Sequence, residues 1–350
     1  MTDTPVGRRM RWLFALPVAA ACGWLFDLLH APLAWMIGPL LCMAAINGMN
    51  GRVAFPVSGR YLGQWIVGCA LGLYFTWPVL HRLADMAGWI ALAVALSLAT
   101  SLLAGRVLNR VGRVDKTTAF FASSVGGAVE MANQAERHGG RVDQVAAAQV
   151  TRVLFVVVTL PFAYEWLGLH GNDAPVLAEQ ILRYPGLLAL LCGGLAAGGL
   201  LNRCKVPNAW LFGPLLFSAV FTASGHPLSL VPSWLLDTGQ LLIGCSLGAR
   251  FAPEFFRESP RFLLGVVISG LVLLLGCVCI GMLVATFSGI PIPTAVLATA
   301  PGGIAEMGLT AKVLQLGVPV VTAFHTARLV IVVLSVGPAH AWLAKRAKRR

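Results

Sequence analysis

The stretch TAPGGIAEM, residues 299–307, places a proline, two glycines and a carboxylate inside a run that is otherwise apolar. Its part GGIAEM has a twin, GGAVEM, at residues 126–131, which lies 176 positions earlier. The proline belongs to the second copy alone, since Val125 occupies the position that matches Pro301. Both copies share the glycine pair and the glutamate, which are Gly126, Gly127 and Glu130 in the first copy and Gly302, Gly303 and Glu306 in the second.

Two more motifs occur twice at nearly the same spacing. PLAWMIGPLL at residues 32–41 returns as PNAWLFGPLL at 207–216, with seven of ten positions identical. GQWIVGCALG at 63–72 returns as GQLLIGCSLG at 239–248, with six of ten identical. Three matches in the same order at one period indicate an internal duplication. We therefore expect two membrane repeats, residues 1–175 and residues 176–350.

The composition is that of a membrane protein. Only 11% of the 350 residues are charged and 57% are hydrophobic, whereas about 25% of an average soluble domain is charged. A membrane-spanning helix needs roughly 20 mostly apolar residues, so recurring apolar segments predict an all-α polytopic protein in a lipid bilayer. The segments lie near residues 12–29, 32–48, 61–77, 87–107, 117–134 and 142–168, and then near 186–201, 208–223, 233–249, 261–287, 293–312 and 318–343.

The positions of Lys and Arg predict the topology, because short cytoplasmic loops collect these residues. The basic regions are the N-terminal tail, 49–60 and 105–116 in the first half, and 202–206, 249–261 and the C-terminal tail in the second. All of them face the cytoplasm only if the fifth segment of each half, which carries GGxxEM, enters and leaves the membrane on the same side. We therefore expect two inverted repeats, each with five transmembrane helices and one re-entrant or broken helix.

This topology places both termini in the cytoplasm and the linker with Asp173 and Glu179 outside a bacterial cytoplasmic (inner) membrane. The net charge of +12 resides in the loops and tails and not in a folded polar domain. We therefore expect no direct binding of nucleic acid.

The paired motifs GGxxEM, PxAWxxGPLL and GQxxxGCxLG resemble the AbrB family of bacterial membrane proteins, which is unrelated to the soluble DNA-binding regulator of the same name. The resemblance covers essentially the whole chain. Members carry the labels "aidB regulator" and ammonia monooxygenase. The family is similar to the cation–proton antiporter and anion transporter group with inverted five-helix repeats. The resemblance thus implies a duplicated membrane fold but little about mechanism.

Glu130 and Glu306 are the main candidates for a functional site. A carboxylate at membrane depth costs about 2.5 kcal/mol or more, so it normally faces protein or water and has a partner. Arg152 and Arg328 follow the two glutamates by 22 residues in each copy, which makes them natural partners. Either each pair pins its hairpin to the next helix, or the carboxylates bind a proton, a cation or a substrate near the midplane.

The four glycines allow left-handed or extended backbone, which breaks a helix and frees amide and carbonyl groups. A half-helix that starts at such a break suits an anion, and unwound carbonyls suit a cation. Close helix packing through small residues is the alternative. Ser123, Ser124 and Thr299 beside the glycines extend the candidate site, and Gln64 and Gln240 either bond across helices or contact substrate.

These features predict a secondary transporter of a small solute or ion. A membrane-embedded monooxygenase would need clustered metal ligands, but no two of the seven histidines are closer than 15 positions and no two cysteines form C-x-x-C. We therefore expect no catalytic residue, metal or cofactor. The third hypothesis is a membrane regulatory protein. Because the tails are too short to read DNA, we expect any regulation of gene expression to be indirect.

Overall fold

The computed structural model describes residues 5–49, 53–171, 182–251 and 260–348. In these ranges every regular element is one of fifteen helices. Six of them are long and apolar enough to cross a membrane, which confirms the prediction of an all-α polytopic membrane protein. Some predicted features lie outside the described residues. They are the linker residues Asp173 and Glu179, the basic residues Arg52 and Arg257, and the boundary between the predicted repeats.

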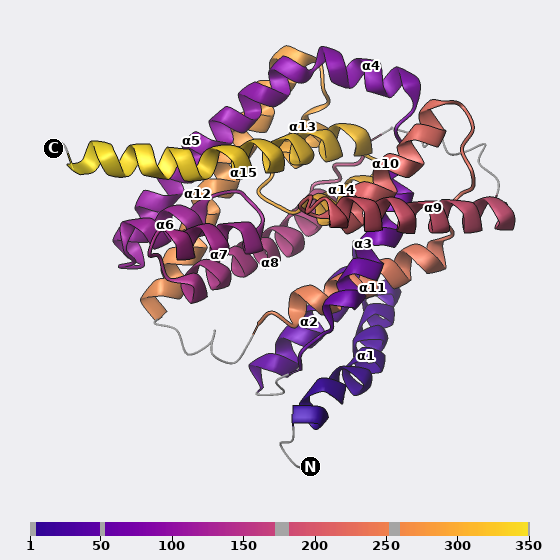
Figure 1. Ribbon diagram of the computed structural model, residues 1–350, viewed down its shortest axis with the longest axis horizontal. Coiled ribbons are helices and arrows are strands. Elements are labelled where there is room, and N and C mark those ends of the chain that lie inside the picture. The colour runs from indigo at the N-terminus through magenta and orange to yellow at the C-terminus, as the bar shows by residue number, and fades with distance from the viewer. Residues whose placement is uncertain (1–4, 50–52, 172–181, 252–259, 349–350) are drawn as a thin grey trace. The chain divides into compact units, whose positions relative to one another are not determined.

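The predicted apolar segments correspond to helices throughout the chain (Figure 1). Those outside the fifth segments are α1 (Pro5–Leu28), α2 (Ala34–Gly48), α3 (Val57–Gly72), α5 (Ala87–Val111), α8 (Val142–Trp166), α9 (Tyr184–Arg203), α10 (Ala209–Ala223), α11 (Ser233–Gly248), α12 (Pro260–Ser288) and α15 (Val318–Lys348). An additional helix that the sequence did not predict, α4 (Trp77–Asp85), follows α3 at an angle of 93°. None of its residues is fully buried, although Val79, Leu80 and Leu83 are partly covered.

The fifth segment of each half is a broken helix. In the first half α6 (Lys116–Ser123) ends and α7 (Ala128–Arg137) begins after the four residues 124–127. In the second half α13 (Ile292–Thr299) and α14 (Ile304–Val313) are separated by the matching residues 300–303. Both breaks therefore fall where the two GGxxEM motifs begin.

The chain forms two compact units that interleave in sequence. Unit 1 consists of residues 1–84, 161–256 and 308–319, and unit 2 of residues 85–160, 257–307 and 320–350. Each unit therefore takes helices from both halves of the sequence, with α1–α3 and α9–α11 in unit 1, and α5, α6, α12 and α13 in unit 2.

Within unit 1, each packed pair of helices has a counterpart formed by the corresponding helices of the other half. Helix α2 packs on α11 as α10 packs on α3, and α1 packs on α2 as α9 packs on α10. A β-carbon at Gly68 of α3 would meet Leu211 O of α10 at 2.5 Å. A β-carbon at the matching Gly244 of α11 would likewise overlap Met36 O of α2. The repeated motif GQxxxGCxLG is thus explained by two reciprocal helix crossings, where a side chain larger than glycine would force the backbones apart.

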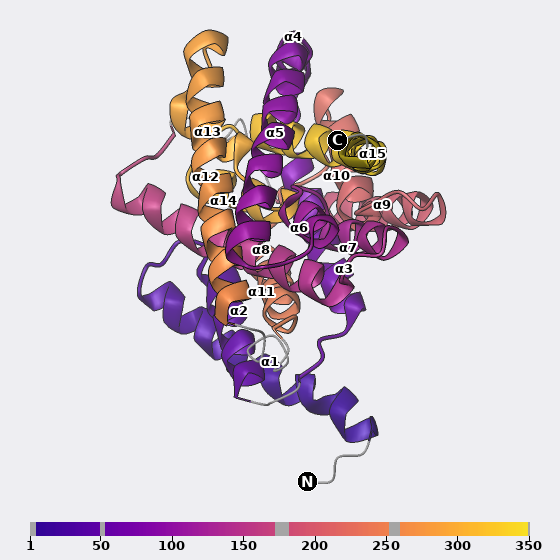
Figure 2. The same ribbon diagram turned by 90° about the vertical axis from the view of Figure 1, so that its left-hand side faces the viewer.

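Unit 2 has the same internal correspondence. Helices α5 and α12 lie side by side (Figure 2), α6 packs on α5, and α13 packs on α12. One cluster of buried side chains draws on α5, α6, α7, α8, α12 and α15 and includes Phe121, Met131 and Phe262. Both breaks, at 124–127 and 300–303, belong to this unit.

Candidate functional site

The first break is held by two polar side chains of α8. Arg152, which is 6% exposed, donates from Nη1 to Ser124 O at 2.9 Å and from Nη2 to Gly126 O at 3.5 Å. Its Nη2 also donates to Gln149 Oε1 at 2.8 Å. Gln149 Nε2 in turn donates to Phe121 O and to Ser124 O, each at 2.9 Å. The carbonyls left without helical partners at the end of α6 thereby gain donors.

The second break repeats this arrangement with one substitution. Arg328 of α15 donates from Nη1 to Ala300 O at 2.6 Å and from Nη2 to Gly302 O at 2.7 Å. Where the first copy has Gln149, the second has His325, whose Nδ1 lies 2.8 Å from Arg328 Nη2 and whose Nε2 lies 3.1 Å from Leu297 O. Both contacts are satisfied by the tautomer that carries its proton on Nε2.

The glutamates lie on the other side of each break, at the start of the second half-helix. Glu130 is the third residue of α7 and Gly127 is its N-cap, which is the spacing of a capping box. A β-carbon at Gly127 would overlap Oε2 of Glu130, so the carboxylate folds back over the start of its own helix. Glu306 lies over Gly303 in the same way. A negative charge in this place is favourable because the N-terminal end of a helix is partially positive.

The glycines are explained by the lack of room for a β-carbon and not by a left-handed backbone. None of the four has a positive φ, and Gly127 adopts φ −67° and ψ 138°, the extended alternative. A β-carbon at Gly126 would lie 2.7 Å from Met131 Cε, and one at Gly302 would lie 2.7 Å from Met307 Cγ. GGxxEM is thus a helix start on which the glutamate and methionine side chains fold back over the two glycines.

The structure gives Arg152 partners other than the predicted one. All its hydrogen bonds go to main-chain carbonyls and Gln149, and among the described residues no ion pair joins it to Glu130. The physical reason is that a break creates two helix ends of opposite partial charge. The arginine binds the negative end of the first half-helix, and the glutamate lies at the positive end of the second.

The other predicted residues divide between the two units. Ser123, Ser124 and Thr299 lie at the breaks in unit 2, whereas Gln64 and Gln240 are buried in unit 1. Thr299 Oγ1 lies 2.8 Å from Cys277 O, and Ser124 Oγ donates to Phe120 O at 2.7 Å. Gln240 Nε2 donates to Asp237 Oδ1 at 3.2 Å.

Gln149 and His325 were missed by the sequence reasoning. They occupy matching positions, three residues before Arg152 and Arg328. A search for polar residues at equivalent positions, and not only for identical ones, would have found them. Across the described ranges, no group of three or more His, Cys, Asp and Glu side chains is placed to hold a metal ion.

The family model described as "Transition state regulatory protein AbrB" matches residues 35–344, a range that includes both breaks and both arginines. The chain belongs to the AbrB family. The resemblance seen in the paired motifs is thereby confirmed.

Two relatives of this AbrB-family chain match it over nearly its whole length. The Bacillus subtilis (strain 168) protein "Uncharacterized protein YhjN" is 29% identical over 350 residues, with 93% of this chain and 91% of that protein covered. The Escherichia coli (strain K12) protein "Putative regulator AbrB" is 28% identical over 321 residues, with 90% of each chain covered. The similarity thus extends over both units of the fold.

Proposed function

We propose that this protein is a secondary transporter of a small solute or ion, with its binding site at the paired breaks. The observation that carries the proposal is that unit 2 contains two matching helix breaks, each with a buried arginine on one helix end and a carboxylate on the other. Interrupted helices at corresponding positions of two halves are the usual location of a transporter's binding site.

Glu130 and Glu306 are the groups that we assign to the ligand. The carbonyls of the first break are already engaged by Arg152 and Gln149, so an incoming ion meets the carboxylate more readily than a free carbonyl. A proton or cation on the carboxylate would weaken its attraction to the helix end. Binding and the conformation of the break would then be coupled, which alternating access requires.

The inverted orientation of the two repeats is part of the proposal. It is supported by the positions of the basic loops. Reporter fusions in a bacterial host can test it. Green fluorescent protein should fluoresce after Arg113 and after Lys205, and alkaline phosphatase should be active after Gly225. The same reporter active after both Lys205 and Gly225 would contradict the topology.

Reconstituted vesicles test the transport function itself. Vesicles loaded with a pH-sensitive dye are given gradients of Na⁺, K⁺, Cl⁻ or short carboxylates, and proton flux is followed. We expect flux above that of empty vesicles, lost in Glu130→Gln and in Glu306→Gln. Glu136→Gln is the matched control, because Glu136 is an exposed carboxylate on the same helix α7. Wild-type flux that persists in the double variant would refute the assigned site, and no flux for the whole panel would refute the proposal for these solutes.

We further propose that any effect on gene expression is indirect and follows from the transported solute. The names of the family model and of the Escherichia coli relative contain the word regulator or regulatory. Sequence-specific binding of DNA by the purified protein would contradict this part of the proposal.

A further inference from the structure

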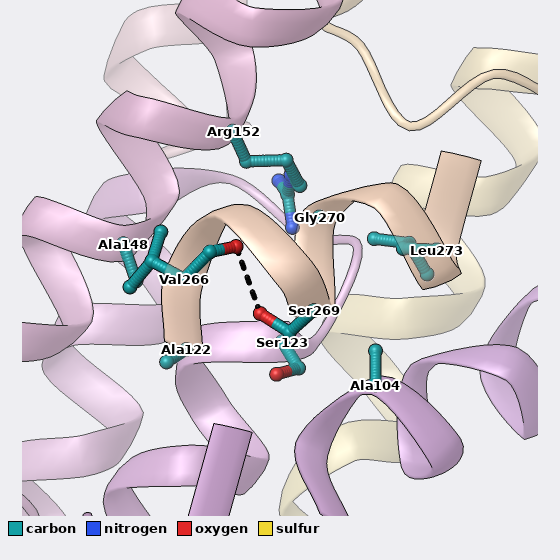
Figure 3. A pocket seen from close by; sticks show the side chains of 9 residues that line it. All are labelled: Ala104, Ala122, Ser123, Ala148, Arg152, Val266, Ser269, Gly270 and Leu273. Carbon is teal, nitrogen blue, oxygen red and sulfur yellow. Dashed lines mark hydrogen bonds between the residues drawn. The ribbon is translucent and has the colours of Figure 1, made fainter. Parts of the chain in front are cut away.

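A small cavity lies beside the first break within unit 2. Its volume is about 10 Å³, which is room for about one water molecule or one monatomic ion. Figure 3 shows the side chains around it. They come from α5, α6, α8 and α12 and are Ala104, Ala122, Ser123, Ala148, Arg152, Val266, Ser269, Gly270 and Leu273.

Two polar atoms of this lining have no hydrogen-bond partner. They are Nε of Arg152 and Oγ of Ser123, and the two residues are only 6% and 5% exposed. Leaving a buried polar group without a partner costs about 1–3 kcal/mol, and more for a charged group. The third polar side chain of the lining is already engaged, because Ser269 Oγ donates to Val266 O at 3.0 Å.

Gly270 supplies an independent sign that the space is empty. It is buried inside α12, yet a β-carbon at this position would meet no heavy atom within 4 Å. Another buried glycine of the same helix shows the opposite. A β-carbon at Gly265, five residues earlier on α12, would meet the backbone of Gly112 at 2.7 Å. Gly270 therefore keeps space open that no neighbouring helix occupies.

Three small residues around the cavity have larger counterparts in the other copy of the repeat. A shift of 176 matches Ala148 with Phe324, Ala104 with Ile280 and Gly270 with Val94, and these three larger side chains are buried. The residue that matches Ser123 is Thr299, whose Oγ1 bonds Cys277 O at 2.8 Å. The two halves thus agree in the arginine but differ in every one of these neighbours. These four positions around the cavity are therefore not conserved between the two copies of the repeat.

The lining favours an anion over water. Arg152 Nε can only donate a hydrogen bond, Ser123 can donate a second, and five of the other lining residues are Ala, Val or Leu. A bound water molecule needs acceptors for its two hydrogens, whereas a monatomic anion has no hydrogen and only accepts hydrogen bonds. Arg152 has no carboxylate in ion-pair contact among the described residues. A buried charge in a membrane is costly. The helix end that Arg152 contacts carries only a partial negative charge, and one bound monovalent anion would neutralise the arginine.

We propose that this cavity is a binding site for one small monovalent anion of the halide type, held by Arg152 Nε and Ser123 Oγ in the first half of the chain. The size of the cavity favours the smaller halides, since larger ones have to displace the lining. The site does not require that the protein transports anything, so it stands or falls separately from the transport proposal.

Anion exchange at constant ionic strength tests the site. The full-length protein in neutral detergent is unfolded thermally in sodium gluconate, whose anion is too large for the cavity, and gluconate is replaced stepwise by fluoride, chloride, bromide or iodide. We expect a saturable rise in Tm of roughly 2–4 °C with the smaller halides. Equilibrium dialysis with radioactive chloride should give about one ion per chain.

Three variants test whether the halide-dependent rise in Tm arises at the cavity. Gly270→Val places in the cavity the side chain found at the matching position 94, and Ser123→Ala removes the hydroxyl donor. We expect Gly270→Val to abolish the halide-dependent rise and Ser123→Ala to weaken chloride binding several-fold. Gly199→Ala is the control, since a β-carbon there also meets nothing within 4 Å but lies on α9 in unit 1. A wild-type Tm that does not depend on the anion, or a halide effect retained in both cavity variants, would overturn the proposal and leave water as the occupant.

Discussion

An alanine at position 127 should destabilise the first break only while Glu130 is present. Two terms that do not involve Glu130 nearly cancel. Alanine is less favourable than glycine at an N-cap, which destabilises the protein by about 0.5–1 kcal/mol. It also lowers the entropy of the unfolded chain, which stabilises the protein by about 0.4–1 kcal/mol. Gly127 has φ −67° and ψ 138°, which alanine adopts without strain.

The remaining term is the carboxylate. The three atoms nearest to a β-carbon at 127 all belong to Glu130, so alanine has to displace this side chain from the helix end. A negative charge at a helix N-terminus contributes about 0.3–1 kcal/mol, and up to about 2 kcal/mol when partly buried. We therefore expect Gly127→Ala to cost about 1–2 kcal/mol in the wild-type background and close to nothing in a Glu130→Ala background.

A double-mutant cycle measures this difference. The free energy of unfolding is determined in mixed micelles by tryptophan fluorescence for wild type, the two single variants and the double variant. Gly303→Ala with Glu306→Ala repeats the cycle in the second copy. Glu136→Ala controls for the loss of a carboxylate from the same helix. An equal cost of Gly127→Ala in both backgrounds would show that the glycine is required for another reason.

Two further substitutions test the packing and the break. Arg328→Lys should lower the free energy of unfolding by about 1–3 kcal/mol, because lysine cannot reproduce the planar fork of donors and leaves a carbonyl such as Gly302 O unpaired. Thermal unfolding would show this, and an unchanged Tm would count against the role of the guanidinium. Gly68→Ala should cost about 1–3 kcal/mol, because its β-carbon would lie 2.5 Å from Leu211 O. The open position Gly199 should tolerate alanine, and equal effects of the two substitutions would be inconsistent with a close helix crossing at 68.

The apolar segments and the positions of both breaks were predictable because their causes are local. A spanning helix requires only length and apolarity, and a glycine pair before a glutamate marks the start of a new helix in the sequence itself. The duplication was equally accessible, since it is a comparison of the chain with itself. Helix α4 was not predicted, because nearly all of it lies between the third predicted segment, 61–77, and the fourth, 87–107.

The partners of Arg152 and Arg328 were not predictable in the same way. Their spacing from the glutamates suggested ion pairs, but a distance along the chain does not say where the carbonyls at the end of α6 point. Those carbonyls meet Arg152 only after α6 and α8 pack together. His325 and Gln149 were missed for a related reason, since they support the arginines with different chemistry at matching positions.

The sequence by itself determined that the chain is a duplicated helical membrane protein with one broken helix in each half, because apolarity, period and glycine pairs are local properties. Only the tertiary structure decided that each arginine binds the carbonyl end of its break, that each glutamate folds over the glycine of its own helix start, and that a cavity lies between Arg152 and α12. These features depend on which helix ends and side chains meet across the packed unit, and the order of residues along the chain does not fix those distances.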